Sequence, residues 1–196
     1  DGYHIVTVIA AHAANATLYQ GKLPFDTQKS FAPISLVAIA PLVMTANLSM
    51  PFKDVREMIA YARANPGKLN YGSAGPGNTS HLAVEYFKSV AGVDMTHVPY
   101  KGTAPALNDV IAGHIQVLFS DAPPGLPQIR AGKVRALGVT TARRIPVAQE
   151  IPPIADTVKG FDTAPWQMLM APSGTPAPIV DKLHKAIVEY IASADG

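Results

Sequence analysis

The sequence contains no cysteine, which excludes disulfides, thiolate chemistry and cysteine-ligated zinc from this chain. Charged residues make up only 15% of the chain, and no block of like charge indicates a surface for nucleic acid. The most apolar stretch, residues 34–46, is short and is broken by Pro41, so no direct membrane insertion is expected. Hydrophobic residues make up 48% of the chain, which is enough for a buried core.

The amino-terminus shows no signal peptide. Asp1 leads almost directly into an apolar, β-branched stretch, residues 3–9, which predicts a buried parallel strand. Small residues at 10–14 predict a loop, with a short helical turn around Thr17. We therefore expect the sequence to begin within a longer protein.

Short strands and helices alternate along the rest of the chain. Asp54 and Glu57 have the spacing of a helix-capping box, and Ala83, Tyr86, Phe87 and Val90 form the apolar face of a later helix. Strands are expected within residues 34–48 and at residues 69–72, 95–99, 117–120, 134–139 and 166–170. This alternation predicts an α/β fold with mostly parallel sheets.

The most informative segment is the glycine-rich loop at residues 71–81, between a strand and a helix. A helix that starts at the carboxyl end of a strand offers unpaired N–H groups and its positive dipole end, which suit an anion. Ser73, Asn78, Thr79 and Ser80 add side-chain donors. The alternative is that these are ordinary turn residues and a helix cap.

Three further loops are weaker candidates for the same crevice. Gly102 and Thr103 follow the next strand, although Thr103 also suits a plain helix cap. Asp121 follows a third strand, where its carboxylate suits a ligand ammonium or hydroxyl group or, alternatively, caps the next helix. His12 and Asn15 follow the first strand.

Catalytic and cofactor patterns are missing. The loop at residues 71–81 does not end as a phosphate-binding loop does, and neither a dinucleotide fingerprint nor a nucleophile elbow occurs. The six histidines are spread one per element without metal-ligand spacing, and a lone histidine is more often a surface or satisfied core residue. Glu85 occupies a position expected to face solvent. We therefore expect no enzyme activity, no metal and no cofactor.

Two segments together resemble a known family. Residues 71–82 have the sequence YGSAGPGNTSHL, and residues 97–106 have the sequence HVPYKGTAPA. With further matches in the same order along the chain, they are similar to the substrate-binding receptors of tripartite tricarboxylate transporters, often called Bug receptors. The further matches are residues 1–3, 23–26, 64–71, 131–136 and 171–176.

The resemblance implies a periplasmic solute-binding protein of the two-lobed type II fold, joined by crossover strands, that closes on a small carboxylate by hinge motion. Such a receptor captures an amino acid, a di- or tricarboxylate or an aromatic acid and delivers it to integral membrane transporter subunits. Lobe one is expected at residues 1–47 and 164–196, and lobe two at residues 48–163. The family's first strand, with its Pro-Gly-Gly loop, and the family's carboxyl-terminal end are absent here, so lobe one is expected to be incomplete.

The resemblance also carries the binding role onto individual positions, mainly as backbone amides. The expected ligand-binding residues are His12, Asn15, Ser73, Ala74, Gly75, Asn78, Thr79, Ser80, Gly102, Thr103, Ala104, Asp121 and Ala122. Two other functions fit the same fold, namely the effector-binding domain of a transcription regulator and a transferase. A DNA-binding domain upstream would indicate the former, and a general base beside residues 72–80 the latter.

Overall fold

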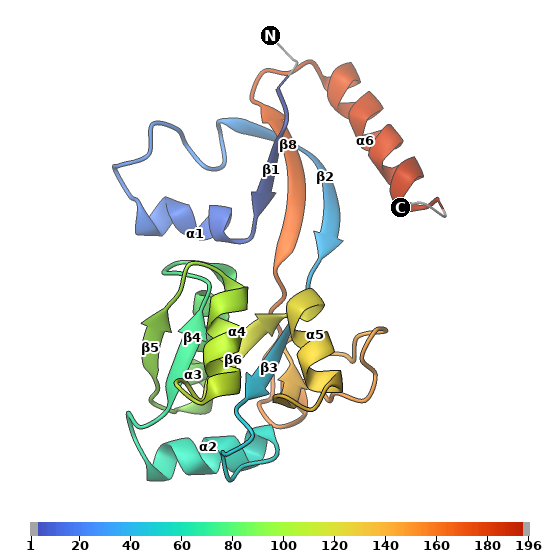
Figure 1. Ribbon diagram of the computed structural model, residues 1–196. Coiled ribbons are helices and arrows are strands. Elements are labelled where there is room, and N and C mark those ends of the chain that lie inside the picture. The colour runs from blue at the N-terminus through green and yellow to red at the C-terminus, as the bar shows by residue number, and fades with distance from the viewer. Residues whose placement is uncertain (1–3, 194–196) are drawn as a thin grey trace. The chain divides into compact units, whose positions relative to one another are not determined.

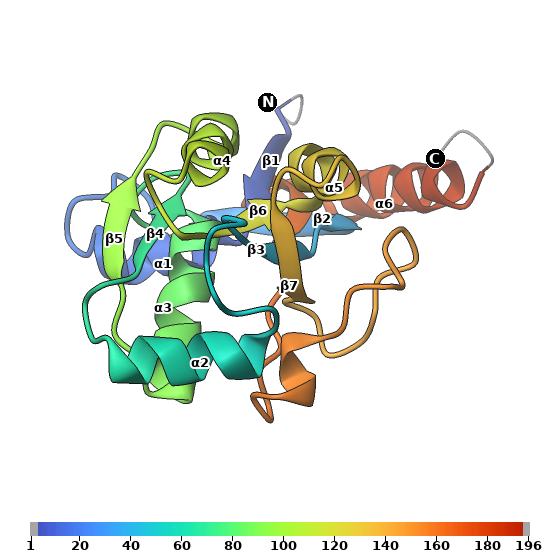
Figure 2. The same ribbon diagram turned by 60° about the horizontal axis from the view of Figure 1, so that its bottom comes forward.

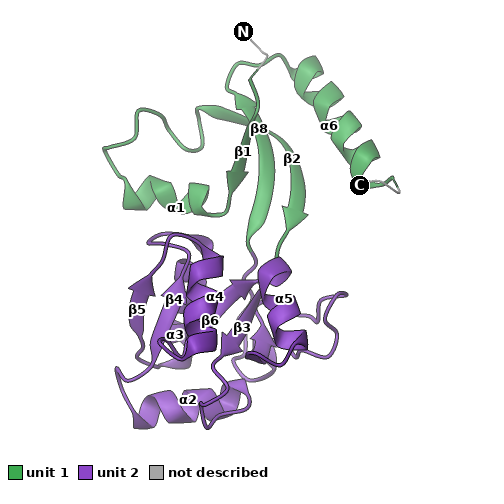
Figure 3. Cartoon of the chain, viewed as in Figure 1, with its two compact units in different colours: residues 1–40, 165–196 green, residues 41–164 purple. Residues whose placement is uncertain are grey.

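The computed structural model describes residues 4–193 and divides into two compact units. Unit 1 comprises residues 1–40 and 165–196, and unit 2 comprises residues 41–164 (Figure 3). The boundaries expected from sequence were 47/48 and 163/164, so the first differs by seven residues. The reason is strand β3 (Leu42–Ala46), whose backbone pairs with strands of unit 2.

Unit 1 is built on a three-stranded antiparallel sheet of order β1-β8-β2 (Figure 1). Its strands are β1 (Val6–Ile9), β2 (Phe31–Ile39) and β8 (Trp166–Pro172). The expected buried parallel strand at residues 3–9 is therefore wrong for the part described: β1 is antiparallel to β8 and mostly exposed, and residue 3 lies outside the described range. A β-branched run predicts a strand, but the direction of pairing depends on a partner far away in sequence.

Two helices complete unit 1, α1 (Ala11–Leu18) and α6 (Ala177–Ile191). The loop expected at residues 10–14 is wrong, since α1 begins there. Its N-cap residue, Ala10, makes no side-chain capping bond, so the usual start signal is missing although alanine is the strongest helix former. Helix α6 packs on β2, where Nδ1 of His184 lies 2.8 Å from the carbonyl oxygen of Ile34.

Unit 2 is built on a five-stranded mixed sheet of order β5-β4-β6-β3-β7 (Figures 1 and 2). The α/β fold is confirmed, but the sheets are not mostly parallel. Strand β4 runs parallel to β5 and β6, whereas β3 runs antiparallel to β6 and β7. Besides β3, the strands are β4 (Asn70–Ser73), β5 (Thr96–Pro99), β6 (Val117–Asp121) and β7 (Arg135–Val139).

The helices of unit 2 follow the strands that the sequence predicted. They are α2 (Val55–Ala64), α3 (Thr79–Ala91), α4 (Thr103–Ala112), α5 (Ala122–Arg130) and a 3-10 turn, η1 (Ile154–Asp156). The predicted cap of α2 is confirmed, since the Asp54 carboxylate accepts from the Glu57 N–H at 2.8 Å. The Glu57 carboxylate accepts from the Lys53 N–H at 2.7 Å rather than from Asp54.

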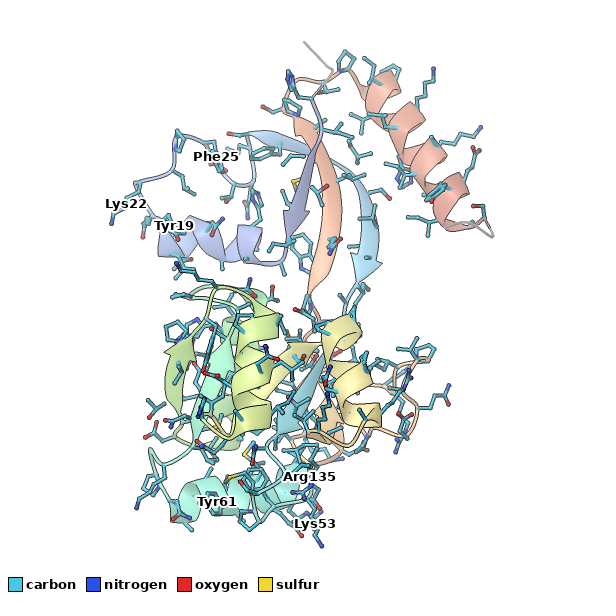
Figure 4. All side chains as sticks on the ribbon, in the orientation of Figure 1. Tyr19, Lys22, Phe25, Lys53, Tyr61 and Arg135 are labelled. Atoms are coloured by element: carbon cyan, nitrogen blue, oxygen red, sulfur yellow. The ribbon has the colours of Figure 1, made fainter. Side chains whose placement is uncertain are left out.

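Arg135 fixes the connection between β3 and α2. Its guanidinium donates to the carbonyl oxygens of Met50, at 3.0 Å, and Phe52, at 2.6 Å. The Phe52 ring lies 5.6 Å from the Tyr61 ring, and Figure 4 shows Arg135, Tyr61 and Lys53 at this end of unit 2. The anchored connection sets where α2 begins.

The main core of unit 2 lies between α3 and the sheet. Phe87 on α3 meets Phe119 on β6, with ring centroids 5.9 Å apart, and both are fully buried. Of the face expected for α3, Ala83 and Phe87 are buried, but Tyr86 and Val90 are 41% and 42% exposed. Tyr86 lies at the rim because its ring stacks on Phe161 while its hydroxyl donates to the carbonyl oxygen of Gly160. In the described part of the chain, no helix is long and apolar enough to cross a bilayer.

Candidate functional site

Three helix N-termini lie along one edge of the unit 2 sheet. Strands β5, β4 and β6 are parallel neighbours, so their carboxyl ends meet at the same edge. Helices α4, α3 and α5 begin after these three strands, in that order. Each helix start presents N–H groups and a positive dipole end, and an edge of this kind is where α/β sheets bind ligands.

The loop after β4 is held by its own side chains. The Ala74 N–H donates to the Ser80 hydroxyl at 3.0 Å, and the Gly75 N–H donates to the Ser73 hydroxyl at 3.2 Å. The side chains of Ser73 and Ser80 are buried, with exposed fractions of 0% and 3%. These two serines therefore shape the loop from inside, and their hydroxyls are not presented at its surface.

The second half of the loop caps α3. The Asn78 side chain accepts from the Ser80 N–H at 3.2 Å, and Nδ1 of His81 accepts from the Gly77 N–H at 3.1 Å. Gly77 has a φ of 72°, a left-handed conformation that favours glycine. Within the described residues, the N–H groups of Thr79 and His81 have no hydrogen-bond partner. These two donors in the first turn of α3 remain available.

The starts of α4 and α5 are tied together. The Thr103 hydroxyl donates to the Asp121 carboxylate at 2.5 Å, which joins the first residue of α4 to the last residue of β6. Asp121 is the N-cap residue of α5 but makes no side-chain capping bond. Gly102, the N-cap residue of α4, has a φ of 123°. The Asp121 carboxylate therefore braces two helix starts against each other instead of capping its own helix.

Prolines reduce the donors along this edge. Pro105 removes one N–H from the first turn of α4, and Pro123 and Pro124 remove two from that of α5. The remaining first-turn amides include those of Thr103, Ala104 and Ala122, none of which has a hydrogen-bond partner among residues 4–193. Eleven of the expected ligand-binding residues thus lie at one edge of unit 2. The Ser73 and Ser80 hydroxyls and the Thr103–Asp121 pair hold the loops in place, and a small set of free amides remains.

A column of rings supports the loop after β4, and sequence reasoning missed it. The His81 and His97 rings stack at a centroid distance of 4.1 Å, and the Tyr71 ring stacks on His97 at 4.9 Å. Nε2 of His97 lies 2.6 Å from the Ser73 hydroxyl oxygen. The histidines belong to α3 and β5, so their separation in sequence gave no sign of the contact. The parallel pairing of Tyr71 with His97 was the signal available, since these residues face each other across two predicted strands.

Charged groups complete the column. The Tyr71 hydroxyl donates to the Glu85 carboxylate at 2.5 Å, and the Lys88 ammonium donates to the same oxygen at 2.8 Å. Burial, and then the bond to Glu85, raises the pKa of the Tyr71 phenol. Burial opposes ionisation of Glu85, but the bonds from Lys88 and Tyr71 outweigh it and lower the pKa of the carboxyl group. The Glu85 side chain is 42% exposed, in line with its expected solvent-facing position, but its carboxylate also anchors this column.

The contact between Ser73 and His97 resembles an activated serine nucleophile, since the two atoms are within hydrogen-bond reach. However, Ser73 is fully buried, so its hydroxyl is not open to a substrate. Among the described residues, no group of three or more histidine, aspartate or glutamate side chains is placed to hold a metal ion.

The candidates of unit 1 form a separate cluster. Nε2 of His12 lies 2.9 Å from the carbonyl oxygen of Thr27, and its ring meets the Phe25 and Phe31 rings at 6.4 and 5.3 Å. The carbonyl oxygen of Asn15 accepts from the Tyr19 N–H within the helix end. His12 thus anchors the segment between α1 and β2 within unit 1.

Two surface hollows are each lined by residues of a single unit. One of about 330 Å³ is formed by the end of α1 and the following loop, and its lining includes Tyr19 and Phe25, both labelled in Figure 4. The other, of about 420 Å³, is lined by α2, the end of α3 and residues 157–159. Neither contains a residue of the helix-start edge.

Unit 2 is thus an α/β unit with three helix N-termini gathered at one edge of its sheet. A family model described as the tripartite tricarboxylate transporter family receptor matches residues 1–194, and the chain belongs to this family. The resemblance found in the sequence is therefore confirmed.

Individual relatives agree with this assignment. A UPF0065 protein in the tcbD-tcbE intergenic region of Pseudomonas sp. (strain P51) is 34% identical over 100% of this chain and 58% of its own length. Protein BugT of Bordetella pertussis is 29% identical over 98% of this chain and 60% of its own length. The chain thus spans about three fifths of these curated relatives.

Solved structures show the same likeness. The structure titled "R. palustris Rpa4515 with adipate" has a TM-score of 0.88 and 37% identity, covering 100% of this chain and 66% of that one. MatC from Rhodopseudomonas palustris with bound malate has a TM-score of 0.83 and 30% identity, covering 100% of this chain and 67% of that one. Periplasmic binding protein BugD has a TM-score of 0.84 and 33% identity, covering 99% and 65%.

Proposed function

We propose that this chain is the larger part of a periplasmic receptor that binds a small dicarboxylate and presents it to membrane subunits of a tripartite tricarboxylate-type transporter. The observation that carries the proposal is the edge formed by β5, β4 and β6, where the starts of α3, α4 and α5 lie side by side. Family membership supports the receptor role. The two similar structures with adipate and malate support the ligand class.

The chemistry of the edge favours a carboxylate. Free backbone N–H groups at the starts of α3 and α4 can donate to a ligand carboxylate. Each such charge-assisted hydrogen bond contributes about 1.5–3 kcal/mol. Helix dipoles add about 0.3–1 kcal/mol each at an exposed edge. Two prolines follow Ala122 at the start of α5, so we place the bound carboxylate at the starts of α3 and α4, with Thr79, His81, Thr103 and Ala104 as amide donors.

We assign no catalytic step to this site. Its serine is buried, and the histidines are engaged with the loop. A transferase of the same fold would need an accessible general base here. Incubation of the full-length protein with acyl or phosphoribosyl donors is expected to give no turnover.

A single substitution tests the proposed donors. Ala104→Pro removes one amide N–H from the second position of α4, a position where proline fits a helix. Helix α5 already has this arrangement, because Ala122 is followed by Pro123 and Pro124 at the same edge. Loss of one charge-assisted bond should weaken adipate binding by about tenfold or more. The matched control is Ala177→Pro, at the exposed first turn of α6 in unit 1.

Calorimetric titration of the full-length protein with adipate, malate and the neutral diamide of adipate measures the effect. We expect both dicarboxylates to bind more tightly than the diamide, and only Ala104→Pro to weaken them. Binding of a phosphorylated compound in place of every carboxylate would overturn the proposed ligand class. Unchanged adipate affinity in folded Ala104→Pro protein would overturn the placement at α4.

A further inference from the structure

His81 and His97 hold the two halves of the loop that begins α3. Nδ1 of His81 accepts from the Gly77 N–H at 3.1 Å, four residues back along the chain. His97 reaches the other half through Ser73, whose hydroxyl oxygen lies 2.6 Å from Nε2 and also accepts from the Gly75 N–H at 3.2 Å. The conformation of residues 73–80 therefore depends on two imidazoles that are stacked on each other.

The two histidines respond differently to a proton. The bond from Gly77 needs a lone pair on Nδ1 of His81, which only the neutral ring has. A protonated His81 would place an N–H opposite the Gly77 N–H, and two donors repel. A protonated His97 keeps its contact, because the Ser73 hydroxyl can accept from it while donating to the carbonyl oxygen of Gly75 at 3.3 Å. His81 is therefore the sensitive member of the pair.

The surroundings of the pair limit it to one proton. Two imidazolium rings at 4.1 Å would repel strongly, and burial, followed by the charge of His81, lowers the pKa of His97. Tyr71 on β4 faces the pair as a neutral phenol, while Glu85 and Lys88 on α3 form an ion pair beside it. The opposite charges of Glu85 and Lys88 largely offset each other, so protonation at His81 is the main charge change near the loop.

We propose that His81 is a positioning residue for ligand binding, and that its protonation releases Gly77, loosens the start of α3 and lowers carboxylate affinity in mild acid. The inference rests on the proposed receptor function, because it concerns the loop that would hold the carboxylate. The expected fall in carboxylate affinity on acidification is opposite to the effect of charge attraction alone, because a cationic His81 would attract an anion.

The test uses the full-length protein with adipate as the probe, titrated by calorimetry from about pH 8 to about pH 5.5, the range in which histidine changes charge. In His81→Asn, the side-chain oxygen takes the place of Nδ1 as an acceptor and does not titrate. His114→Asn is the matched control, since His114 is a surface histidine whose ring is 72% exposed. The wild-type protein and His114→Asn should lose about tenfold in affinity on acidification, whereas His81→Asn should change by about twofold or less.

A second measurement needs no ligand. The Gly77 amide resonance should shift with pH together with the His81 ring resonances in the wild-type protein, and should stay constant in His81→Asn. A Gly77 amide that ignores the His81 titration overturns the inference, as does His81→Asn protein that keeps the wild-type pH dependence. If no carboxylate binds at any pH, the proposed function fails, while the Gly77 titration still decides whether His81 positions the loop.

Discussion

Unit 2 buries most of its large apolar side chains, whereas unit 1 leaves many of comparable size at its surface. In unit 2, Met44, Phe87 and Phe119 have no exposed surface. In unit 1, Ile39 is 60% exposed, and neither α1 nor α6 contains a buried residue. The helices and strands of unit 2 are therefore stabilised mainly by burial of apolar side chains. Those of unit 1 depend more on strand pairing and on a few specific contacts.

The amphipathic pattern of α6 illustrates the same contrast. Val180, Leu183, Ile187 and Ile191 recur at helical spacing. The first three are partly buried, whereas Ile191 is exposed. Helical periodicity therefore predicts which face of a helix turns inward and does not predict how completely that face is covered.

The largest expected effect comes from the core of unit 2. Phe119→Ala should lower the free energy of unfolding by about 3–5 kcal/mol, because the cavity it leaves is enclosed by packed rings. Ile39→Thr in unit 1 should stay within about 0.5 kcal/mol, because the side chain is mostly exposed and β-branching is kept.

Urea unfolding separates the two units. Trp166, the single tryptophan, lies in β8 and reports on unit 1, whereas the helical circular dichroism comes largely from unit 2. Phe119→Ala should move the dichroism transition further than the fluorescence transition. Equal losses of unfolding free energy in Phe119→Ala and Ile39→Thr would contradict this difference between the units.

A specific contact should matter more in unit 1 than its exposed apolar residues. His12→Phe keeps a ring beside Phe25 and Phe31 but loses the bond at the carbonyl oxygen of Thr27. The expected cost is about 1 kcal/mol, measured from the Trp166 fluorescence transition. A loss no larger than that of Ile39→Thr would show that this contact does not stabilise unit 1.

Alkaline pH should lower the stability of unit 2 gradually, through the ionisation of Tyr100. Burial, followed by the hydrogen bond to Asp109, raises the pKa of Tyr100 from 10.0 to about 12. The unfolded chain therefore loses this proton first, so the contribution is complete below about pH 10 and is lost as the pH rises toward 12. Tyrosinate absorbance should show a step near pH 12 that disappears in Tyr100→Phe. Tyr19→Phe in unit 1 is the control, and a step at this pH that survives Tyr100→Phe would assign it to another tyrosine.

The smallest effect is expected from surface ion pairs. Lys88→Met removes the bond to Glu85 and the contact of the ammonium group with the Tyr71 ring, 5.5 Å away. Because this lysine is only 19% exposed, the cost should approach 1 kcal/mol. Lys185→Met, in an exposed pair on α6 with a separation of 3.9 Å, should cost close to nothing. Thermal melts of both variants would sharpen the contrast, and the reverse order would contradict it.

The sequence predicted best where local chemistry decides the structure. The cap at Asp54 and the glycine-rich loop before α3 follow from side-chain hydrogen bonds and backbone freedom within a few residues. A helical turn was expected around Thr17, but the start of α1 was placed too late because Ala10 offers no capping oxygen. The antiparallel direction of β1 depends on β8, a partner that lies far from Val6–Ile9 in the sequence.

The candidate site divides in the same way. That three helix starts share one edge followed from the order of strands and loops, once β5, β4 and β6 were taken as parallel. The brace between Thr103 and Asp121 and the stacking of His81 on His97 join different elements. Contacts of this kind arise from packing in three dimensions, which the spacing of residues along one element does not encode.

The pairing of β2 with β8 has a consequence for how the nascent chain folds. Ile39 pairs with Trp166, and the Ala40 N–H donates to the carbonyl oxygen of Pro165 at 2.8 Å, so residues 41–164 leave and return at adjacent strand ends. A ribosome therefore completes every residue of that inserted segment before β8 emerges. The insertion can collapse first and shorten the loop whose closure entropy opposes the pairing of β2 with β8. Residues 166–172 then complete the sheet of unit 1 by pairing between β1 and β2, which are both synthesised earlier.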